Sequence, residues 1–164
     1  MQNQPHSNTF SKAIIMKKIF LSMAVAVALM GSAFAAPAEK EPSVTVKMAF
    51  AKEFADVKEV KWEVVKENNV YEASFMFNNE SMQAYFSGEG EFLGTMRQIS
   101  KSRLPVLAAN ALAKNYGGAY VVSVFEHGMP EALDYYITLS TEKGGLILQA
   151  TGNGELTVYK RIRQ

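Results

Sequence analysis

Apolar residues along the chain change their spacing several times, and each change indicates a new element of secondary structure. The first periodic stretch follows Pro42 and Ser43, a pair typical of a helix start. Four apolar residues then recur at steps of three or four and share one helical face: Val44, Met48, Ala51 and Ala55. We therefore expect a helix from Val44 to about Ala55.

Beyond this helix the period falls to two, which is typical of strands with one buried face. Asn69 and the residues from Asn78 to Ser81 interrupt the alternation and predict turns. The pattern predicts four strands, at about 60–65, 71–77, 82–86 and 92–98.

A second helix and a second group of strands follow in the same order. Leu104 and Pro105 open the helix, and Gly117-Gly118 is expected to end it because glycine tolerates positive φ. Four further strands are predicted, at about 120–125, 133–139, 146–150 and 156–162.

Two glycine turns suggest an internal duplication. Gly88-Glu89-Gly90-Glu91-Phe92 matches Gly152-Asn153-Gly154-Glu155-Leu156 at an offset of 64, and Arg97 matches Arg161 at the same offset. We expect an α+β fold of two tandem helix-plus-four-stranded antiparallel meander repeats, 44–98 and 99–164, forming a curved sheet with helices on one face. The alternative is one α+β domain with two similar hairpin turns.

The first 35 residues have the pattern of a leader. Lys17 and Lys18 precede an apolar run of about a dozen residues, which is shorter than the ~20 that a membrane-spanning helix needs. Ala33-Phe34-Ala35 then forms an A-x-A cleavage site. We expect Met16 to be the true start, cleavage before Ala36, a linker over 36–43, and a periplasmic or secreted product without a membrane span.

Charge and cysteine content narrow the functional classes. The leader holds three of the 17 basic residues and none of the 16 acidic ones, so the mature chain carries 14 basic residues and a net charge of −2. This balance argues against a nucleic-acid binder, which would need a concentrated basic surface. The chain has no cysteine, which excludes disulfides and a bacterial lipid anchor at the cleavage site.

The mature chain resembles the PepSY-like family of exported bacterial proteins. The resemblance is carried by Phe54, Val60-Lys61-Trp62, Tyr71-Glu72-Ala73, the Gly-x-Gly turn and Leu104-Pro105. That family is similar in architecture to the β-lactamase inhibitory protein, which grips an enzyme with its open sheet face and loops. The resemblance implies a continuous, curved antiparallel sheet with helices on one face, but it transfers no binding role and assigns no contact residue to this chain.

The sequence offers few candidate catalytic residues. His127 is the only mature histidine, and its neighbours Gly128 and Pro130 predict a solvated hairpin loop rather than the rigid setting of a catalytic base. The Gly88-x-Gly90 turn precedes a strand, whereas a phosphate-binding loop precedes a helix. We therefore expect no enzyme activity, no cofactor and no metal.

Strand alternation divides the side chains between two faces of the predicted sheet. One face is expected to form the core against the helices: Trp62, Tyr71, Ala73, Phe75, Ala84, Phe86 and Phe92, then Tyr135, Ile137, Leu139, Leu146, Leu148, Leu156 and Val158. The opposite face carries a candidate partner-binding set: Met76, Tyr85, Arg97, Tyr136, Tyr159 and Arg161. Tyrosine and arginine are enriched at protein interfaces, although cross-strand pairing alone could account for them.

These patterns favour an exported, non-catalytic protein-binding module whose partner is another exported protein. An inhibitor of a periplasmic or secreted enzyme such as a peptidase is one such function. The alternative is an envelope protein that binds a small ligand or a peptide between sheet and helices. The oligomeric state is not predicted.

Overall fold

The computed structural model describes residues 41–65 and 69–162. The predicted leader and cleavage site, and most of the predicted linker, lie outside the described residues. The elements are helix α2 (Val44–Glu53), strands β1 (Val60–Val65), β2 (Val70–Phe77), β3 (Glu80–Ser87) and β4 (Phe92–Ile99), the 3-10 helix η2 (Lys101–Arg103), helix α3 (Val106–Tyr116), and strands β5 (Tyr120–Met129), β6 (Ala132–Thr141), β7 (Gly144–Thr151) and β8 (Leu156–Ile162).

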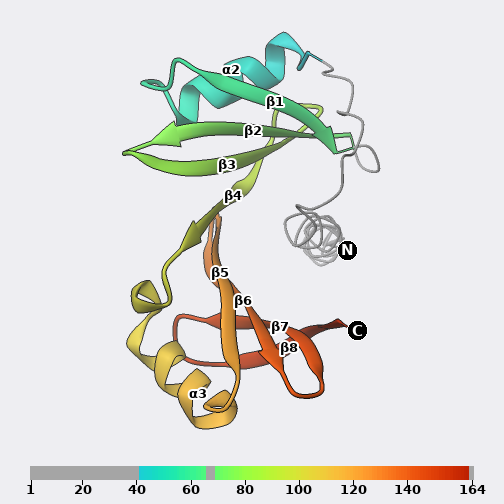
Figure 1. The fold of residues 1–164 in the computed structure, drawn as a ribbon. Helices are drawn as coiled ribbons and strands as arrows, with labels where there is room; N and C mark the ends of the chain where they lie inside the picture. Colours follow the sequence, from blue (N-terminus) through green and yellow to red (C-terminus); the bar gives the residue numbers. More distant parts are fainter. Residues whose placement is uncertain (1–40, 66–68, 163–164) are drawn as a thin grey trace, which may run out of the picture.

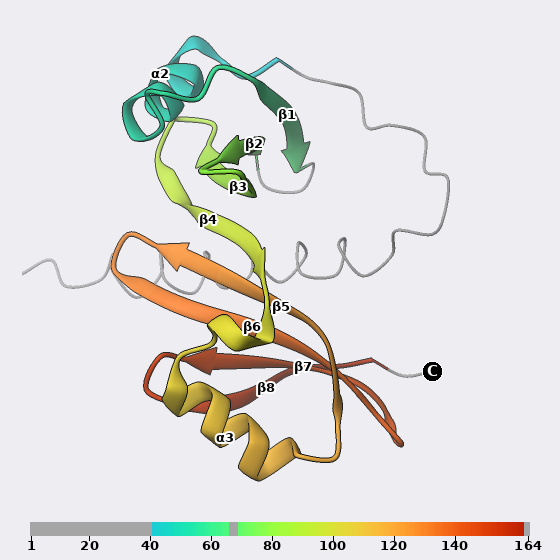
Figure 2. The ribbon, with the colours of Figure 1, turned by 60° about the vertical axis from the view of Figure 1, so that its left-hand side comes forward.

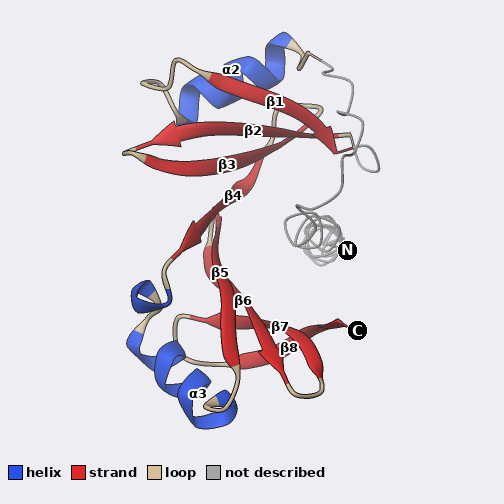
Figure 3. Cartoon of the chain, viewed as in Figure 1, coloured by secondary structure: helices blue, strands red, loops and turns tan. Residues whose placement is uncertain are grey.

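All eight strands form one antiparallel sheet in chain order, from β1 at one edge to β8 at the other. Strands β4 and β5 pair from Thr95↔Gly128 to Ile99↔Val124 and link the two ends of the molecule (Figures 1 and 3). The expected fold class of two helix-plus-four-strand repeats is therefore wrong, because the described chain is mainly one continuous sheet with two α-helices. Local periodicity predicts strands but does not show that the ladder continues from β4 to β5.

Each helix packs on one end of the sheet (Figure 2). Helix α2 begins at Ser43, whose Oγ accepts a hydrogen bond from the backbone nitrogen of Val46 at 3.3 Å. Its buried residues Val46 and Phe50 meet the predicted core residues of β1 to β4. The apolar face expected from Val44, Met48, Ala51 and Ala55 is therefore wrong, because all four residues are exposed. Helix α3 ends before Gly117, whose φ of −59° is right-handed, so the expected positive φ is not used there.

Aromatic rings dominate the first core, and aliphatic side chains dominate the second. Phe50 makes edge contacts with Trp62 and Phe75, with ring centroids 5.4 and 5.1 Å apart. Ala108 and Leu112 of α3 contact the aliphatic side chains of the second half of the sheet. The predicted core positions are confirmed except Val158, which is 39% exposed.

Both helices lie on the same face of the sheet, because residues paired directly across strands point to the same side. Ala84 packs under α2 and pairs with Thr95, so Thr95 and Arg97 point to that side. Arg97 pairs with Glu126, and Glu126 pairs with Tyr135, which packs under α3. We call this side the helix face and the other side the helix-free face.

Three register shifts change which residues reach each face, and the one in β5 makes Val122 an extra residue. Phe86 pairs with Phe92 but Tyr85 pairs with Gly94, so Leu93 is an extra residue in β4. Similarly, Leu148 pairs with Val158 whereas Ile147 pairs with Lys160, which makes Tyr159 an extra residue in β8. One extra residue reverses the direction of every side chain beyond it.

Candidate protein-binding face

The six residues of the candidate partner-binding set do not share one face. Beyond the bulge in β4, Arg97 points to the helix face, and beyond the bulge in β8 Arg161 pairs with Leu146 and does the same. The other four, Met76, Tyr85, Tyr136 and Tyr159, lie on the helix-free face. The expected position of the two arginines is therefore wrong, whereas the partner-binding role of the set stays a prediction.

Aromatic side chains cross the helix-free face from β3 to β8. We call them the aromatic strip: Tyr85, Phe125, His127, Tyr136 and Tyr159. Tyr136 is central, because its ring lies 5.8 Å from the ring of His127 and 5.0 Å from that of Tyr159. Adjacent strands thus bring the rings of His127, Tyr136 and Tyr159 close together. Phe125 and His127 are the two members of the strip that the sequence did not predict on this face.

The strip ranges from buried to partly exposed. Tyr85 is 1% exposed and packs with Val70, Leu93 and Met96. Phe125 and Tyr159 are partly exposed, and Met76 on β2 is 61% exposed. The side chains that a partner could reach first are therefore at Met76, Phe125 and Tyr159.

Polar pairs border the strip at both ends. Gln83 Nε2 donates to Glu72 Oε1 at 2.8 Å, and Gln149 Nε2 donates to Asp134 Oδ2 at 2.7 Å. Burial raises the pKa of Glu72, and the nearby charge of Glu63 raises it further. An aromatic centre with a polar rim is the arrangement typical of protein interfaces.

His127 lies in β5 instead of a loop, which corrects the expected solvated position. The strand continues to Met129, so His127 pairs with Met96 on one side and Asp134 on the other. The side chain is 1% exposed. Burial lowers the pKa of His127 to about 4, and the nearby charge of Asp134 offsets part of this shift. The histidine is therefore neutral at pH 7 and contributes an uncharged ring to the strip.

Tyr159 carries a polar group that the described residues leave unsatisfied. Its hydroxyl oxygen is buried and has no hydrogen-bond partner among them. Burial also raises the pKa of this hydroxyl, so it stays protonated and able to donate. Buried hydroxyl groups in proteins are nearly always hydrogen-bonded, so this hydroxyl is an exception among the described residues.

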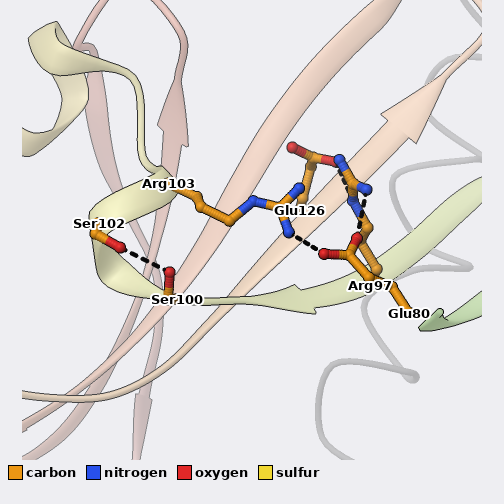
Figure 4. A network of polar contacts seen from close by, with 6 residues as sticks. All are labelled: Glu80, Arg97, Ser100, Ser102, Arg103 and Glu126. Carbon is orange, nitrogen blue, oxygen red and sulfur yellow. Dashed lines mark hydrogen bonds and ion pairs between the residues drawn. The ribbon is translucent and has the colours of Figure 1, made fainter. Parts of the chain in front are cut away.

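Arg97 is not part of the helix-free face. It lies at the junction between the two cores, where carboxylates connect it to neighbouring strands and to η2 (Figure 4). Its Nε donates to Glu126 Oε1 at 2.6 Å, and its Nη1 donates to Glu80 Oε2 at 2.8 Å. Arg103, the last residue of η2, also donates to Glu80. These contacts connect β3, β4 and β5 on the helix face, so the first role of Arg97 is structural.

Within residues 41–65 and 69–162 no group of three or more histidine, aspartate or glutamate side chains is placed to hold a metal ion. None of the helices in this described part is both long enough and apolar enough to cross a membrane.

No family model matches the sequence, and no curated protein matches it. Solved structures do match. A BLIP-like protein from Bacteroides fragilis has a TM-score of 0.68 and 20% identity, with 77% of this chain and 91% of that one covered. A DUF2874 family protein from Bacteroides ovatus has a TM-score of 0.65 and 20% identity, covering 73% of this chain and 89% of that one.

A third structure, from Bacteroides eggerthii and provisionally described as periplasmic, has a TM-score of 0.64 and 18% identity, with 75% and 89% of the two chains covered. At these identities the likeness concerns the fold alone. It confirms the BLIP-like architecture that the sequence resemblance implied, while membership of the PepSY-like family stays a prediction.

Proposed function

We propose that this chain is an exported, non-catalytic protein-binding module that docks another exported protein on the helix-free face. The observation that carries the proposal is the aromatic strip, which lies on the face opposite both α-helices. Tyr85, His127 and Tyr136 are already buried, whereas Phe125 and Tyr159 stay partly exposed. The two α-helices pack on the other side of the sheet, so a partner can cover the part of the strip that is still exposed.

The distribution of side chains supports the same face. Interface energy is usually concentrated in a few aromatic residues surrounded by polar groups that exclude water. Phe125 and Tyr159 are partly exposed aromatic residues, and the pairs at Glu72 and Asp134 provide the polar border.

The solved neighbours support export and binding by analogy of fold. One is described as BLIP-like and another carries the provisional periplasmic description, and both share the arrangement of this sheet. An inhibitor of a secreted or periplasmic enzyme is the form of binding that this analogy favours. Because one fold can host unrelated functions, the partner has to be identified by experiment.

The test compares two charged variants of the purified protein as baits for periplasmic and secreted proteins of the parent cell. Met76→Arg places a charge on the helix-free face, and Met48→Arg places one on the outer side of α2, where Met48 is 63% exposed. We expect both variants to have the same melting temperature as the wild type. Met76→Arg should lose the retained partner, whereas Met48→Arg should keep it. Retention by Met76→Arg, or loss by Met48→Arg alone, would place the binding surface elsewhere.

A retained enzyme should then be assayed with increasing amounts of the wild-type protein. Inhibition that saturates at one bait per enzyme supports the inhibitor form of the proposal. Full activity in the saturated complex would exclude inhibition while leaving the docking function in place.

A further inference from the structure

An open pocket lies on the helix face at the opposite side of the sheet from the aromatic strip. Its volume is about 680 Å³, within the range of small-molecule sites. The C-terminal end of α3, the β6–β7 turn and the end of β8 enclose it. β8 also carries Tyr159 of the aromatic strip, but Arg161 points to the helix face with Leu146. A ligand here and a partner there can therefore be tested separately.

The floor of the pocket is apolar. Tyr116, Ala119 and Leu146 line it and at the same time pack against the second core, which holds them in place. Gly144 and Gly145 bring the turn close to β8, because a Cβ at Gly144 would lie 3.0 Å from the carbonyl oxygen of Ile162. The close approach of these backbones shapes one wall without side chains that would fill the space.

Two cationic side chains border this floor. Arg161 comes from β8 and Lys143 from the β6–β7 turn. Both are exposed, and neither side chain forms a hydrogen bond or ion pair with another described residue. Arg161 reaches this side only because of the bulge in β8, which gives it the same face as Leu146.

The charge pattern selects the type of ligand. Glu142 also lines the pocket and offsets one of the two cations, which leaves a net charge of one. That excess suits a single carboxylate better than a multiply charged anion. The carbonyl groups at the end of α3 repel an anion, so the carboxylate should lie on the strand side against Arg161.

We propose that this pocket binds a monocarboxylate with an apolar or aromatic body, the carboxylate on Arg161 and Lys143 and the body on Tyr116 and Leu146. Such a group can come from a small organic acid or from the C-terminal residue of a peptide. The proposal does not rest on protein docking at the helix-free face.

The test is an amide chemical-shift titration of the isotopically labelled protein with 3-phenylpropionate and with its uncharged analogue 3-phenylpropanamide. The acid should shift the amide signals of Gly117, Gly118, Gly144 and Gly145 and bind at least about tenfold more tightly than the amide. Arg161→Gln should weaken acid binding by about tenfold or more, and Lys143→Gln by less. Lys160→Gln, one residue away but paired with Ile147 on the other face, is the matched control and should bind as the wild type does.

A tetrapeptide ending in phenylalanine, with a free or an amidated C-terminus, identifies the source of the carboxylate. Tighter binding of the free peptide than of 3-phenylpropionate assigns the site to chain termini, and the reverse assigns it to small acids. The proposal is overturned by an absence of shifts at these glycines, by equal affinity for acid and amide, or by unchanged binding in both Arg161→Gln and Lys143→Gln.

Discussion

Arg97 of β4 and Glu126 of β5 face each other at the junction between the two cores, with Arg97 Nε 2.6 Å from Glu126 Oε1. The side chain of Glu126 is 18% exposed and that of Arg97 is 26% exposed, so solvent screens this pair less than an ordinary surface pair. The neighbouring carboxylates raise the pKa of Arg97, and its hydrogen bond to Glu126 contributes most.

Removing Arg97 should therefore weaken the junction. We expect Arg97→Met to lower the free energy of unfolding by roughly 1–2 kcal/mol, because Glu126 loses its charged donor in a partly desolvated position. Arg103→Met, which removes a more exposed contact to Glu80, should cost less. Urea unfolding of both variants measures the difference. Equal losses of unfolding free energy in the two variants would show that Arg97 contributes no more to stability than Arg103 does.

The two glycine turns make equivalent contacts with the two helices. In each turn a glycine has positive φ, 83° at Gly90 and 89° at Gly154. A Cβ would lie 3.1 Å from the carbonyl oxygen of Thr45 at Gly90, and 2.8 Å from that of Leu107 at Gly154.

We expect Gly90→Ala and Gly154→Ala each to destabilise the protein by about 1–3 kcal/mol. Two costs add up: an alanine at positive φ is strained, and its Cβ lies too close to a carbonyl oxygen of the helix. Gly152→Ala is the control in the same turn, since a Cβ there meets nothing within 4 Å. Thermal unfolding should show a clear loss for the first two variants and little change for the third. A similar melting temperature for Gly154→Ala and Gly152→Ala would contradict the contact argument.

Trp62 tests the first core. Its ring packs on Phe50 and lies 6.3 Å from that of Phe86. Trp62→Ala should destabilise by about 3 kcal/mol, near the lower end for a truncated core aromatic because the side chain is only partly buried. Tyr120→Ala removes an aromatic residue that is 74% exposed and should be nearly neutral. A mild effect of Trp62→Ala in chemical denaturation would show that the indole contributes little to this core.

His127 should make stability depend on pH. Its folded pKa of about 4 lies below the ordinary value of 6.5, so between these values the unfolded chain binds more protons than the folded one. Stability from this residue is complete above about pH 6.5 and is lost as the pH falls toward 4, by roughly 3 kcal/mol. The change in unfolding free energy between pH 7 and pH 4 should be smaller in His127→Gln. The same pH dependence in the variant would show that the dependence comes from other groups.

The sequence predicts most elements and most core residues of the strands, because alternation depends on burial that is local to each strand. Helical spacing does not select the buried face of α2, where Val44 and Met48 have the same spacing as Val46 and Phe50 but only the second pair is buried. The faces of Arg97 and Arg161 could not be predicted, since each lies beyond a one-residue bulge that periodicity does not reveal. Gly94 and the extra apolar residue at Leu93 were the available signals for the bulge in β4. The position of His127 could not be predicted, because Gly128 beside it is typical of a loop but pairs with Leu133 within β5.

The pocket at Arg161 was also beyond sequence reasoning. It depends on the bulge in β8 and on the approach of the β6–β7 turn to the end of α3, segments that are far apart in the chain. The sequence analysis included the alternative that a small ligand or peptide binds between sheet and helices. That alternative agrees with a site of this kind, but it named no residue.

The most direct test of the docking proposal is the affinity of the identified partner for three forms of the protein, measured by titration calorimetry. The account predicts that Met76→Arg weakens binding at least about tenfold while Met48→Arg binds as the wild type does, with melting temperatures unchanged. Equal affinity of all three forms would contradict the assignment of the helix-free face as the docking surface.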